Sequence, residues 1–383
     1  MVARPGPDRR RTAEGRDGRD ARDGVGRRPH PRRPVELTLV ALIAGFALAA
    51  AFVWLAGVRL SNAVDVLSKR LGWGEAMGGA ILLAIATNLP EIAIVVTAAI
   101  AHNLDIAVGN ILGGIAVQTV VLALLDRWGV RDVPLSYRAA SLGLVIEGAL
   151  VVALLAIVVD GTRLSPNAIY FRLTVPATLI FFLWVAGLWL ISRAQSGLPW
   201  HEQGNPPDGQ KHPRGHRKTI REKQGPSTRR AALEFSAAAA VTLAGGVALE
   251  RLSESISTRI GLSGVLFGAT VLAAATALPE LSTGLQSLKL GDYQLAVSDI
   301  FGGNAFLPVL FLPATIISGS AVLPQAHNTD VYLTALAILL TVIYMGGLIF
   351  RPKRQYWGFG PDSVAVIVLY TLGVVGLVFV AHG

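Results

Sequence analysis

The chain has 383 residues, of which 52% are hydrophobic and only 15% charged, and its mean hydropathy is +0.53. Soluble domains carry about 25% charged residues, so this composition argues against a water-soluble globular enzyme and indicates a protein of the lipid bilayer. The chain contains no cysteine, which excludes disulfides, thiol catalysis, iron–sulfur clusters and cysteine-ligated zinc. Its net charge of +9 does not indicate nucleic-acid binding, because 11 of the 34 Lys and Arg residues lie in the first 34 positions and nine lie between residues 193 and 230.

Residues 1–34 form a tail rich in Arg, Asp, Gly and Pro. Such a composition cannot bury a core, so we predict a disordered basic tail. No cleavage site follows the first apolar stretch, so the tail is not typical of a secretory signal. A start codon placed too early would also explain it, and an arm that binds a membrane surface or nucleic acid is the alternative.

Ten apolar stretches follow that are long enough to cross a bilayer, since a spanning helix needs about 20 apolar residues. They lie at residues 35–58, 75–101, 105–125, 139–159, 173–192, 231–249, 262–288, 294–318, 330–350 and 363–381. Residues 193–230 are basic and rich in Gly and Pro, which is typical of an unfolded linker. We therefore predict a first five-helix repeat at residues 35–192 and a second at residues 231–383, joined by this linker.

The cations between the spans predict the topology. With ten spans, one side of the membrane collects 19 Lys and Arg residues, including the nine of the linker, and the other side collects four apart from the tail. The positive-inside rule then predicts a cell-membrane protein with a cytoplasmic linker and both termini outside. The 11 arginines of the tail oppose this assignment, which leaves three explanations: a tail that is not translated, a tail that crosses despite its charge, or a miscounted span.

An internal repeat relates the two halves. Residues 79–116 align without a gap with residues 268–305 at an offset of 189, and 15 of the 38 positions are identical. Both copies contain T-x-L-P-E, followed 19 residues after the Glu by Asn or Asp and then by Gly-Gly. Five spans separate equivalent points, so the second copy is inverted in the membrane. Inverted repeats with interrupted helices are the architecture of secondary transporters.

The repeated motif places carboxyl and hydroxyl groups inside two spans. An ionised carboxylate at the centre of a bilayer costs about 2.5–3.5 kcal/mol on insertion scales, and no Lys or Arg lies in reach along these spans of Glu91 or Glu280. Each Glu is therefore expected to be protonated or paired with a cation. Thr87 and Thr276 precede the Glu residues by four positions and so share their helix face. These hydroxyls are candidate ligands, although they could instead bond back to their own helix.

A proline stands directly before each Glu. Pro90 and Pro279 have no N–H, so the carbonyls of Ala86 and Ala275, four residues earlier, lose their helical partners. Free carbonyls inside a bilayer are tolerated where they line a cavity or bind a ligand. Ala86 and Ala275 are therefore candidate carbonyl ligands, and a simple helix kink is the alternative.

Asn110 and Asp299 are equivalent positions in the third and eighth spans. Together with the Glu, Thr and carbonyl groups they form a set of hard oxygen ligands, which suits Ca²⁺, an ion that takes about six to eight oxygens. The motifs contain no Cys or His, which disfavours soft metals. The glycines of the second motif are expected to let helices pack closely: Gly109, Gly113, Gly114, Gly302 and Gly303.

Other polar residues carry weaker signals. Glu147 lies inside the fourth span and is either a hydrogen-bonded interhelical group or a proton relay or second ligand. His102 and His327 lie at loops and are expected to be solvated. Asp105 and Asp292 lie near turns, where they attract cations to an entrance or serve only solubility.

At these residues the chain resembles the cation/calcium antiporter superfamily, and in particular its sodium/calcium exchanger branch. The two repeats of that family carry G-[ST]-S-x-P-E, followed by G-N-x-x-G-S-N in the first and D-x-x-G-S-N in the second; here they read ATNLPE with GNILGGI and ATALPE with SDIFGGN. The resemblance implies an all-α membrane protein with ten transmembrane helices as two inverted five-helix repeats. It implies Glu91 and Glu280 as central ligands, Thr87 and Thr276 as calcium and sodium ligands, and Asn110 and Asp299 as completing the site.

The chain also departs from the family pattern. The serine that follows each motif Thr, and that helps to bind sodium in the family, is Asn88 in the first copy and Ala277 in the second. Asn88 still offers an oxygen and is a candidate ligand, whereas Ala277 offers none. G-S becomes G-G in both copies, and Ile115 replaces a family Asn. Fewer of the hydroxyl groups that bind sodium in the family are present, while the carboxylates are kept. Either Na⁺ or H⁺ therefore remains possible as the coupling ion.

We therefore predict a secondary active antiporter, and not an enzyme, that exchanges Ca²⁺ or a similar divalent cation for Na⁺ by alternating access, with H⁺ as the alternative. No cofactor is expected, the partners are inorganic cations and the bilayer, and a monomer is expected. The resemblance alone implies that the first and sixth spans move. A cation channel, whose flux would need no counter-ion, and an intramembrane hydrolase, which would show His ligands or a Ser nucleophile, are the alternatives.

Overall fold

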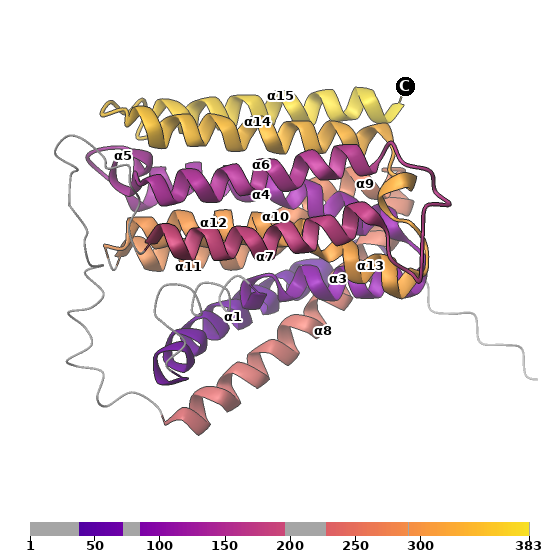
Figure 1. Ribbon diagram of the computed structural model, residues 1–383. Coiled ribbons are helices and arrows are strands. Elements are labelled where there is room, and N and C mark those ends of the chain that lie inside the picture. The colour runs from indigo at the N-terminus through magenta and orange to yellow at the C-terminus, as the bar shows by residue number, and fades with distance from the viewer. Residues whose placement is uncertain (1–37, 72–84, 196–226, 290, 383) are drawn as a thin grey trace, which may run out of the picture. The chain divides into compact units, whose positions relative to one another are not determined.

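The computed structural model describes residues 38–71, 85–195, 227–289 and 291–382 (Figure 1). The predicted tail and most of the predicted linker lie outside these residues. The described residues of the first half form α1 (Leu39–Leu71), α3 (Leu89–Ala101), α4 (Leu104–Gly129), α5 (Leu135–Ala139), α6 (Leu142–Gly161) and α7 (Val175–Gln195). Those of the second half form α8 (Thr228–Ile260), α9 (Gly264–Phe267), the π-helix η3 (Gly268–Leu272), α10 (Ala273–Thr276), α11 (Leu278–Lys289), α12 (Tyr293–Phe306), η4 (Leu307–Leu310), α13 (Phe311–Ser318), η5 (Leu323–Gln325), α14 (Asn328–Phe350) and α15 (Pro361–His382).

Nine helical segments of the described chain are long and apolar enough to cross a membrane, and α3 is a shorter apolar helix. Eight of the predicted spans, 35–58 among them, begin and end within a few residues of these segments. Helix α3 ends where the predicted span 75–101 ends, and residues 75–84 of that span lie outside the described residues. The predicted span 231–249 was too short, because α8 continues to Ile260, and the helix α1 likewise continues beyond its apolar span Leu39–Leu60 to Leu71. The continuations carry charged residues, so an apolar window misses them, and α8 ends only where Gly261 adopts a left-handed conformation (φ 71°).

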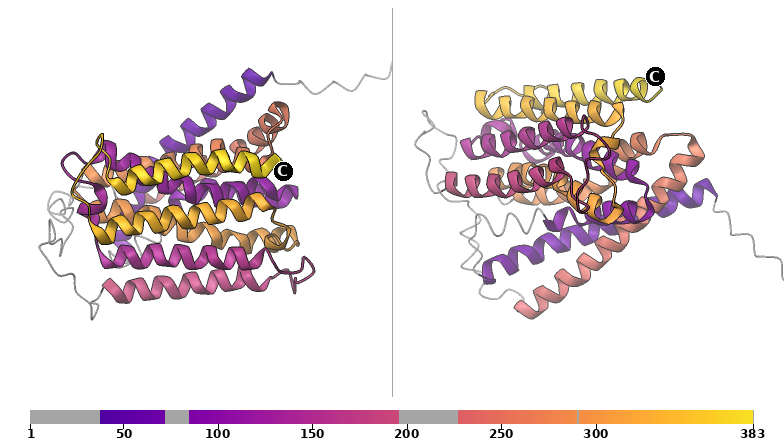
Figure 2. Two further views of the ribbon diagram at one scale, coloured as in Figure 1. Left: turned by 90° about the horizontal axis from the view of Figure 1, so that it is seen from above. Right: turned by 45° about the vertical axis from the view of Figure 1, so that its right-hand side comes forward.

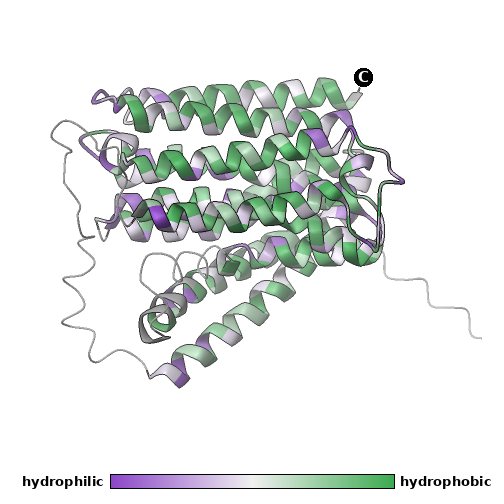
Figure 3. Ribbon diagram, in the orientation of Figure 1, coloured by the Kyte–Doolittle hydropathy of each residue, from purple (hydrophilic) through white to green (hydrophobic). Residues whose placement is uncertain are grey.

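Helix α4 lies at the centre of the bundle. Of its most apolar stretch 89% is buried, compared with 22% in α7 and 17% in α15. Large apolar side chains of α1, α7 and α15 are exposed instead, as expected for helices that face lipid. Hydrophobic residues run along the helices, and hydrophilic residues gather toward their ends (Figure 3).

Helices α1 and α8 extend the repeat beyond the motif. Each has 33 residues, and their starts differ by the offset of 189 that relates the motifs. They pack side by side, inclined to the other long helices (Figures 1 and 2). A Cβ on Gly57 of α1 would lie 2.7 Å from Pro279 Cβ, and a Cβ on Gly246 of α8 would lie 2.7 Å from the Pro90 carbonyl oxygen. Each first helix therefore rests, through a glycine, on the motif proline of the other repeat.

One tight hairpin precedes the last helix of each half, before α7 in the first and before α15 in the second. Tyr170 and Leu173 exchange backbone hydrogen bonds of 2.9 and 2.8 Å, and Tyr356 and Phe359 exchange bonds of 2.7 and 3.0 Å. The two residues between them have positive φ in both cases (50° and 62°, 55° and 84°), which is the geometry of a type I′ turn. The hairpins are related by an offset of 186, so the repeat continues to α7 and α15 with three residues fewer.

Loops that were predicted to share a side of the membrane lie together. The guanidinium of Arg351, after α14, stacks over the ring of Tyr137 in α5 at 5.0 Å, and Arg138 stacks over Tyr293, at the start of α12, at 5.2 Å. Among the loops with fewer cations, Arg172 donates to the Ile316 carbonyl at 3.1 Å. The alternation of loops between two ends agrees with the predicted order of spans.

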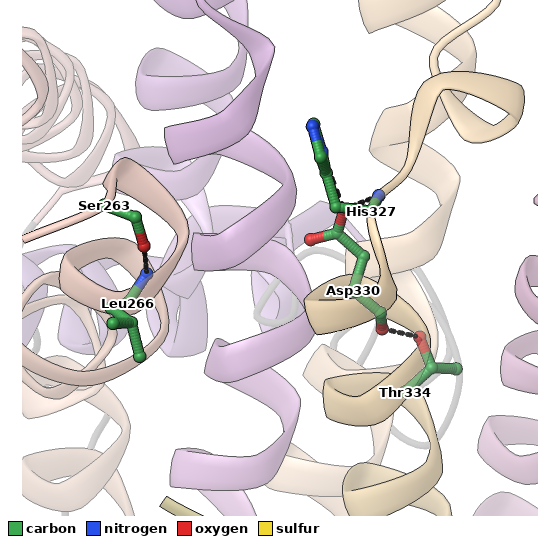
Figure 4. Close-up of polar contacts among 5 residues, drawn as sticks. All are labelled: Ser263, Leu266, His327, Asp330 and Thr334. Carbon is green, nitrogen blue, oxygen red and sulfur yellow. Dashed lines mark hydrogen bonds and ion pairs between the residues drawn. The ribbon is translucent and has the colours of Figure 1, made fainter. Parts of the chain in front are cut away.

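The weaker polar candidates of the sequence lie at helix ends. The backbone N–H of His327 donates to Asp330 Oδ2 at 2.7 Å at the start of α14, and Ser263 caps α9 through Leu266 (Figure 4). Asp292 caps α12 by accepting from Leu295 N at 3.0 Å, and its burial raises the pKa of its carboxyl group. His102 is exposed at the end of α3, as predicted.

Asp126, near the end of α4, ties three segments together. Its Oδ1 accepts from Leu135 N at 2.7 Å, and its Oδ2 accepts from Gly360 N at 2.5 Å and from Ser363 Oγ at 2.8 Å. This fully buried carboxylate therefore caps the starts of α5 and α15 from another helix. Asp126 belongs to neither repeated motif, so its role could not be predicted from the sequence.

Replacing Asp126 with Ala is expected to destabilise the protein by about 3 kcal/mol, because buried donors are left without an acceptor. Thermal unfolding of the purified protein in detergent measures this as a lower melting temperature. The exposed Asp132 is the matched control, since its 3.7 Å ion pair with Arg138 is worth at most about 1 kcal/mol. Equal melting temperatures for the two Ala variants would contradict the capping role.

Candidate functional site

Both copies of T-x-L-P-E break their helix at one residue. In the first, Asn88 (φ −90°, ψ 15°) stands before α3, and in the second, Ala277 (φ −81°, ψ −1°) stands between α10 and α11. The break falls two residues before Pro90 and Pro279, whose missing N–H opens the helical ladder. The predicted interruption of the helices is thus present at equivalent positions in both halves.

Every predicted ligand side chain is buried. Thr87, Asn88, Glu91, Asn110, Thr276 and Glu280 expose at most 1% of their surface and Asp299 exposes 6%. Ala86 and Ala275, whose carbonyls were predicted to be freed, are buried in the turn before each break. Their role as carbonyl ligands stays a prediction.

The site joins the two repeats through Thr276. Its hydroxyl is hydrogen-bonded to the carboxyl group of Glu91 and lies 3.5 Å from Asn110 Oδ1 and 3.2 Å from the Ala273 carbonyl oxygen. One hydroxyl hydrogen cannot serve these three acceptors at once. The surroundings of Thr276 therefore contain more hydrogen-bond acceptor oxygens than its one donor hydrogen can satisfy.

The carboxyl groups add to this surplus of acceptors. Glu280 lies within electrostatic range of both Glu91 and Asp299. Within the described chain, no other residue donates a hydrogen bond to either carboxyl oxygen of Glu280 or to Oε2 of Glu91. Buried acceptors that face one another without donors are stabilised by a cation or by protons.

Two glycines of α4 allow this approach. A Cβ on Gly109 would lie 2.8 Å from the Val265 carbonyl oxygen of α9, and a Cβ on Gly113 would lie 2.2 Å from Ala269 Cα of η3. Asn110 stands between them, so the close contact of the backbones brings its side chain to Thr276. The predicted packing role of these two glycines is confirmed.

Thr283 belongs to the site but was missed by sequence reasoning. Its hydroxyl donates to Asp299 Oδ2 at 2.6 Å and lies 3.1 Å from the Glu280 carbonyl oxygen. The equivalent residue of the first repeat is Ile94, so the comparison of repeats could not reveal it. Its spacing of three residues from Glu280, on the same helix face, was the available signal.

Glu147 of α6 forms an interhelical hydrogen bond. Its Oε1 accepts from Ser298 Oγ of α12 at 3.0 Å, which agrees with the simpler of the two readings of its sequence position. Within the described residues no group of three or more His, Asp or Glu side chains forms a metal-binding cluster. The oxygens that converge here come from carboxyl, hydroxyl and amide groups together.

Comparisons with known proteins show the family to which this chain is similar. A family model described as sodium/calcium exchanger protein matches residues 41–202 and 231–379. Inner membrane protein YrbG of Escherichia coli (strain K12) is 26% identical over 303 residues, which are 75% of this chain and 82% of that protein. Putative antiporter CaxA of Alkalimonas amylolytica is 26% identical over 315 residues, which are 77% and 88% of the two chains.

Solved structures share the architecture. The sodium-calcium exchanger NCX_Mj superposes with a TM-score of 0.56 and 15% identity, covering 88% of this chain and 99% of that chain. The H⁺/Ca²⁺ exchanger CAX superposes with a TM-score of 0.61 and 12% identity, covering 88% and 87%. At these identities the matches establish the fold alone, and they confirm the predicted all-α class of inverted repeats.

Replacing Gly113 with Ala is expected to push α4 away from η3, because the new Cβ has no space beside Ala269. Overpacking of this kind costs about 1–3 kcal/mol, and Asn110 moves away from Thr276. Gly346→Ala is the matched control, since nothing lies within 4 Å of the position of its Cβ. Melting temperature and Ca²⁺ affinity of the purified proteins are the measurements, and equal values for both variants would show that the close approach is unimportant.

Replacing Thr283 with Val is expected to weaken Ca²⁺ binding about tenfold, which corresponds to the loss of one charge-assisted hydrogen bond. The reason is that Asp299 loses the donor that orients its carboxylate. Thr283→Ser keeps the hydroxyl and is expected to bind as the wild type does. Titration calorimetry with Ca²⁺ distinguishes them, and similar affinities for Val and Ser would argue against an orienting role.

Proposed function

Because the chain belongs to the sodium/calcium exchanger family, we propose that it is an antiporter that exchanges Ca²⁺, or a similar divalent cation, for Na⁺, with H⁺ as the alternative coupling ion. The proposed ligands are the predicted set: Glu91, Glu280, Thr87, Thr276, Asn110, Asp299, Asn88 and the carbonyls of Ala86 and Ala275. The observation that carries the proposal is the surplus of buried oxygen acceptors where the two repeats meet.

The proposed mechanism follows from the balance of charge between the buried carboxylates and the bound cations. Glu91, Glu280 and Asp299 supply two or three negative charges to one buried region. One Ca²⁺ neutralises two of them, and several Na⁺ or two protons do the same. A region left empty would hold bare carboxylates in a medium of low dielectric constant, which is penalised. The protein therefore changes between its open states only when cations occupy the region, and this requirement enforces exchange.

Alternating access in this proposal comes from movement of α1 and α8 against the helices that carry the ligands. Both helices contact those ligand helices through a glycine against a motif proline, Gly57 at Pro279 and Gly246 at Pro90. Each glycine lets the two helix backbones approach closely at this contact. The same pair of helices would thus open the site to one side and then to the other.

The chain is a multi-pass membrane protein. For its orientation, we propose the cytoplasmic side for residues 193–230 and for the loops that hold Arg138 and Arg351, which lie at one end of the bundle. Both termini then lie outside. No cofactor is needed, because the transported ions themselves supply the positive charge.

The test is radiolabelled Ca²⁺ uptake into sealed proteoliposomes under an imposed outward Na⁺ gradient and, separately, an imposed pH gradient. Uptake that depends on either gradient supports antiport and identifies the coupling ion. Uptake that follows the Ca²⁺ gradient alone, at equal Na⁺ and pH on both sides, would instead support a cation channel.

Replacing Glu91 or Glu280 with Gln is expected to reduce this exchange by at least about a hundredfold, because the site loses a charge that balances the divalent cation. The amide has the same shape, so melting temperature in detergent should stay close to that of the wild type. Glu234→Gln, at an exposed position of α8, is the matched control. Full exchange in either site variant would end this assignment.

A further inference from the structure

A second pair of buried carboxyl groups lies outside the proposed ion site. Asp126, near the end of α4, is fully buried, and Asp362, the second residue of α15, exposes 7% of its surface. A Cβ on Gly360 would lie 2.6 Å from Asp362 Oδ1 and 3.2 Å from Asp126 Oδ2. The two oxygens are therefore at most about 6 Å apart, a separation at which like charges in a buried region oppose each other. Within the described residues neither carboxyl group forms an ion pair with Lys, Arg or His.

The two carboxyl groups differ in their hydrogen bonds. The three hydrogen bonds that Asp126 accepts stabilise its ionised form. Asp362 lies within reach of the Ser136 hydroxyl and of the first N–H groups of α15, but no donor of the described residues meets either of its oxygens with full hydrogen-bond geometry. The surroundings therefore support a negative charge at Asp126 and do not support a second one at Asp362.

Asp362 is enclosed by backbone and faces a buried hydroxyl group. A Cβ on Gly347 of α14 would lie 2.5 Å from Asp362 Cγ, and Gly360 lies against the carboxyl group as well. Tyr344 stands three residues before Gly347, on the same face of α14. Its hydroxyl is fully buried, has no hydrogen-bond partner among the described residues and lies within electrostatic range of both carboxyl groups. These close backbones favour the smallest cation, a proton, over a hydrated ion.

The charged groups around this pair are few. Within the described chain, Asp126 and Tyr344 are the titratable groups that act on Asp362. The cations at this end of the bundle contact other groups: Arg351 and Lys353 lie over the ring of Tyr137, Arg138 lies over Tyr293, and Arg127 lies against Gly358 of the hairpin.

The first repeat makes the same packing contact without a charge. At the offset of 186 that relates α7 to α15, Pro176 corresponds to Asp362. A Cβ on Gly161 of α6 would lie 3.0 Å from Pro176 Cβ, which repeats the contact that Gly347 makes in the second half. At the same offset an apolar residue, Val158, replaces the tyrosine. Packing of the last helix on the one before it therefore requires neither a carboxyl nor a hydroxyl group.

We propose that Asp362 is a proton-binding site, whose protonated carboxyl group holds the start of α15 against α4, α5 and α14. The carboxylate takes up one proton from water, so the pair carries one negative charge instead of two. The O–H group that forms can donate to the oxygen of a neighbouring hydroxyl, Ser136 or Tyr344. Loss of the proton at alkaline pH places a second charge beside Asp126, whose hydrogen bonds hold the starts of α5 and α15. The site is separate from the proposed ion ligands, and the inference does not depend on the proposed exchange.

The test compares the purified full chain with Asp362→Asn in detergent, by melting temperature at about pH 5 and at about pH 9. The folded wild type keeps a proton that the unfolded chain releases, so its stability falls as the pH rises. The amide is a neutral mimic of the protonated carboxyl group and escapes this loss. Relative to the variant, the wild type is expected to lose at least about 2–4 °C between the two pH values. Asp132→Asn, at an exposed position of the same end, is the matched control and should follow the wild type.

Infrared spectroscopy reads the site directly, because a protonated carboxyl group has a C=O band that a carboxylate lacks. Subtracting the spectrum of Asp362→Asn from that of the wild type at neutral pH should leave this band. The same subtraction with Asp132→Asn should leave none.

A difference in melting temperature that stays constant with pH, or a difference spectrum without the band, would show that Asp362 is ionised and would overturn the proposal. Tyr344→Phe is the second variant, for the case that Asp362→Asn does not fold. It keeps the ring that packs edge-on against Phe301 and removes only the hydroxyl. The ionised carboxyl group then lacks a donor at high pH, so the melting temperature should fall more steeply with pH than in the wild type. An unchanged pH dependence in Tyr344→Phe would likewise count against the site.

Discussion

The cost of placing carboxyl groups inside a bilayer governs this structure. Glu91, Glu280 and Asp299 are buried inside a bundle of apolar helices, and the region around them holds more oxygen acceptors than donors. A soluble protein could solvate such groups, but a membrane protein can stabilise them only with a cation, a proton or a buried partner. The broken helices, the glycines of α4 and the central position of that helix all serve to bring these oxygens together.

Both halves of the inverted repeat contribute the same kinds of elements to the site that holds these carboxyl groups. Each repeat supplies a break, a Pro-Glu pair and a helix whose glycine rests on the proline of the other repeat. The contact between Thr276 and Glu91 crosses from one repeat to the other, so neither half contains a complete site. The two halves differ at positions beside this duplicated centre: Ala277 is apolar where Asn88 is polar, and Ile94 stands where the other repeat has Thr283.

The sequence predicted the parts of the site that are present in both copies. Comparison of the repeats identified the Glu, Thr and Asn/Asp positions and the helix breaks, because identity across 189 residues is visible without a structure. It missed Thr283, whose counterpart is Ile94, since a residue used in only one half leaves no repeated signal. It also missed the capping by Asp126, which depends on α5 and α15 meeting the end of α4. The extra length of α1 and α8 was missed because charged residues at helix ends resemble loops in an apolar window.

The reciprocal contacts of Gly57 with Pro279 and of Gly246 with Pro90 have an energetic consequence. In the proposed alternating-access mechanism, each contact has a counterpart of the same residue types in the other repeat, so two end states related by the repeat would bury similar surfaces and have similar free energies. A protein built in this way has little intrinsic preference for facing inward or outward. In the proposed exchanger the direction of net flow is set by the ion gradients across the membrane, and it reverses when those gradients are reversed.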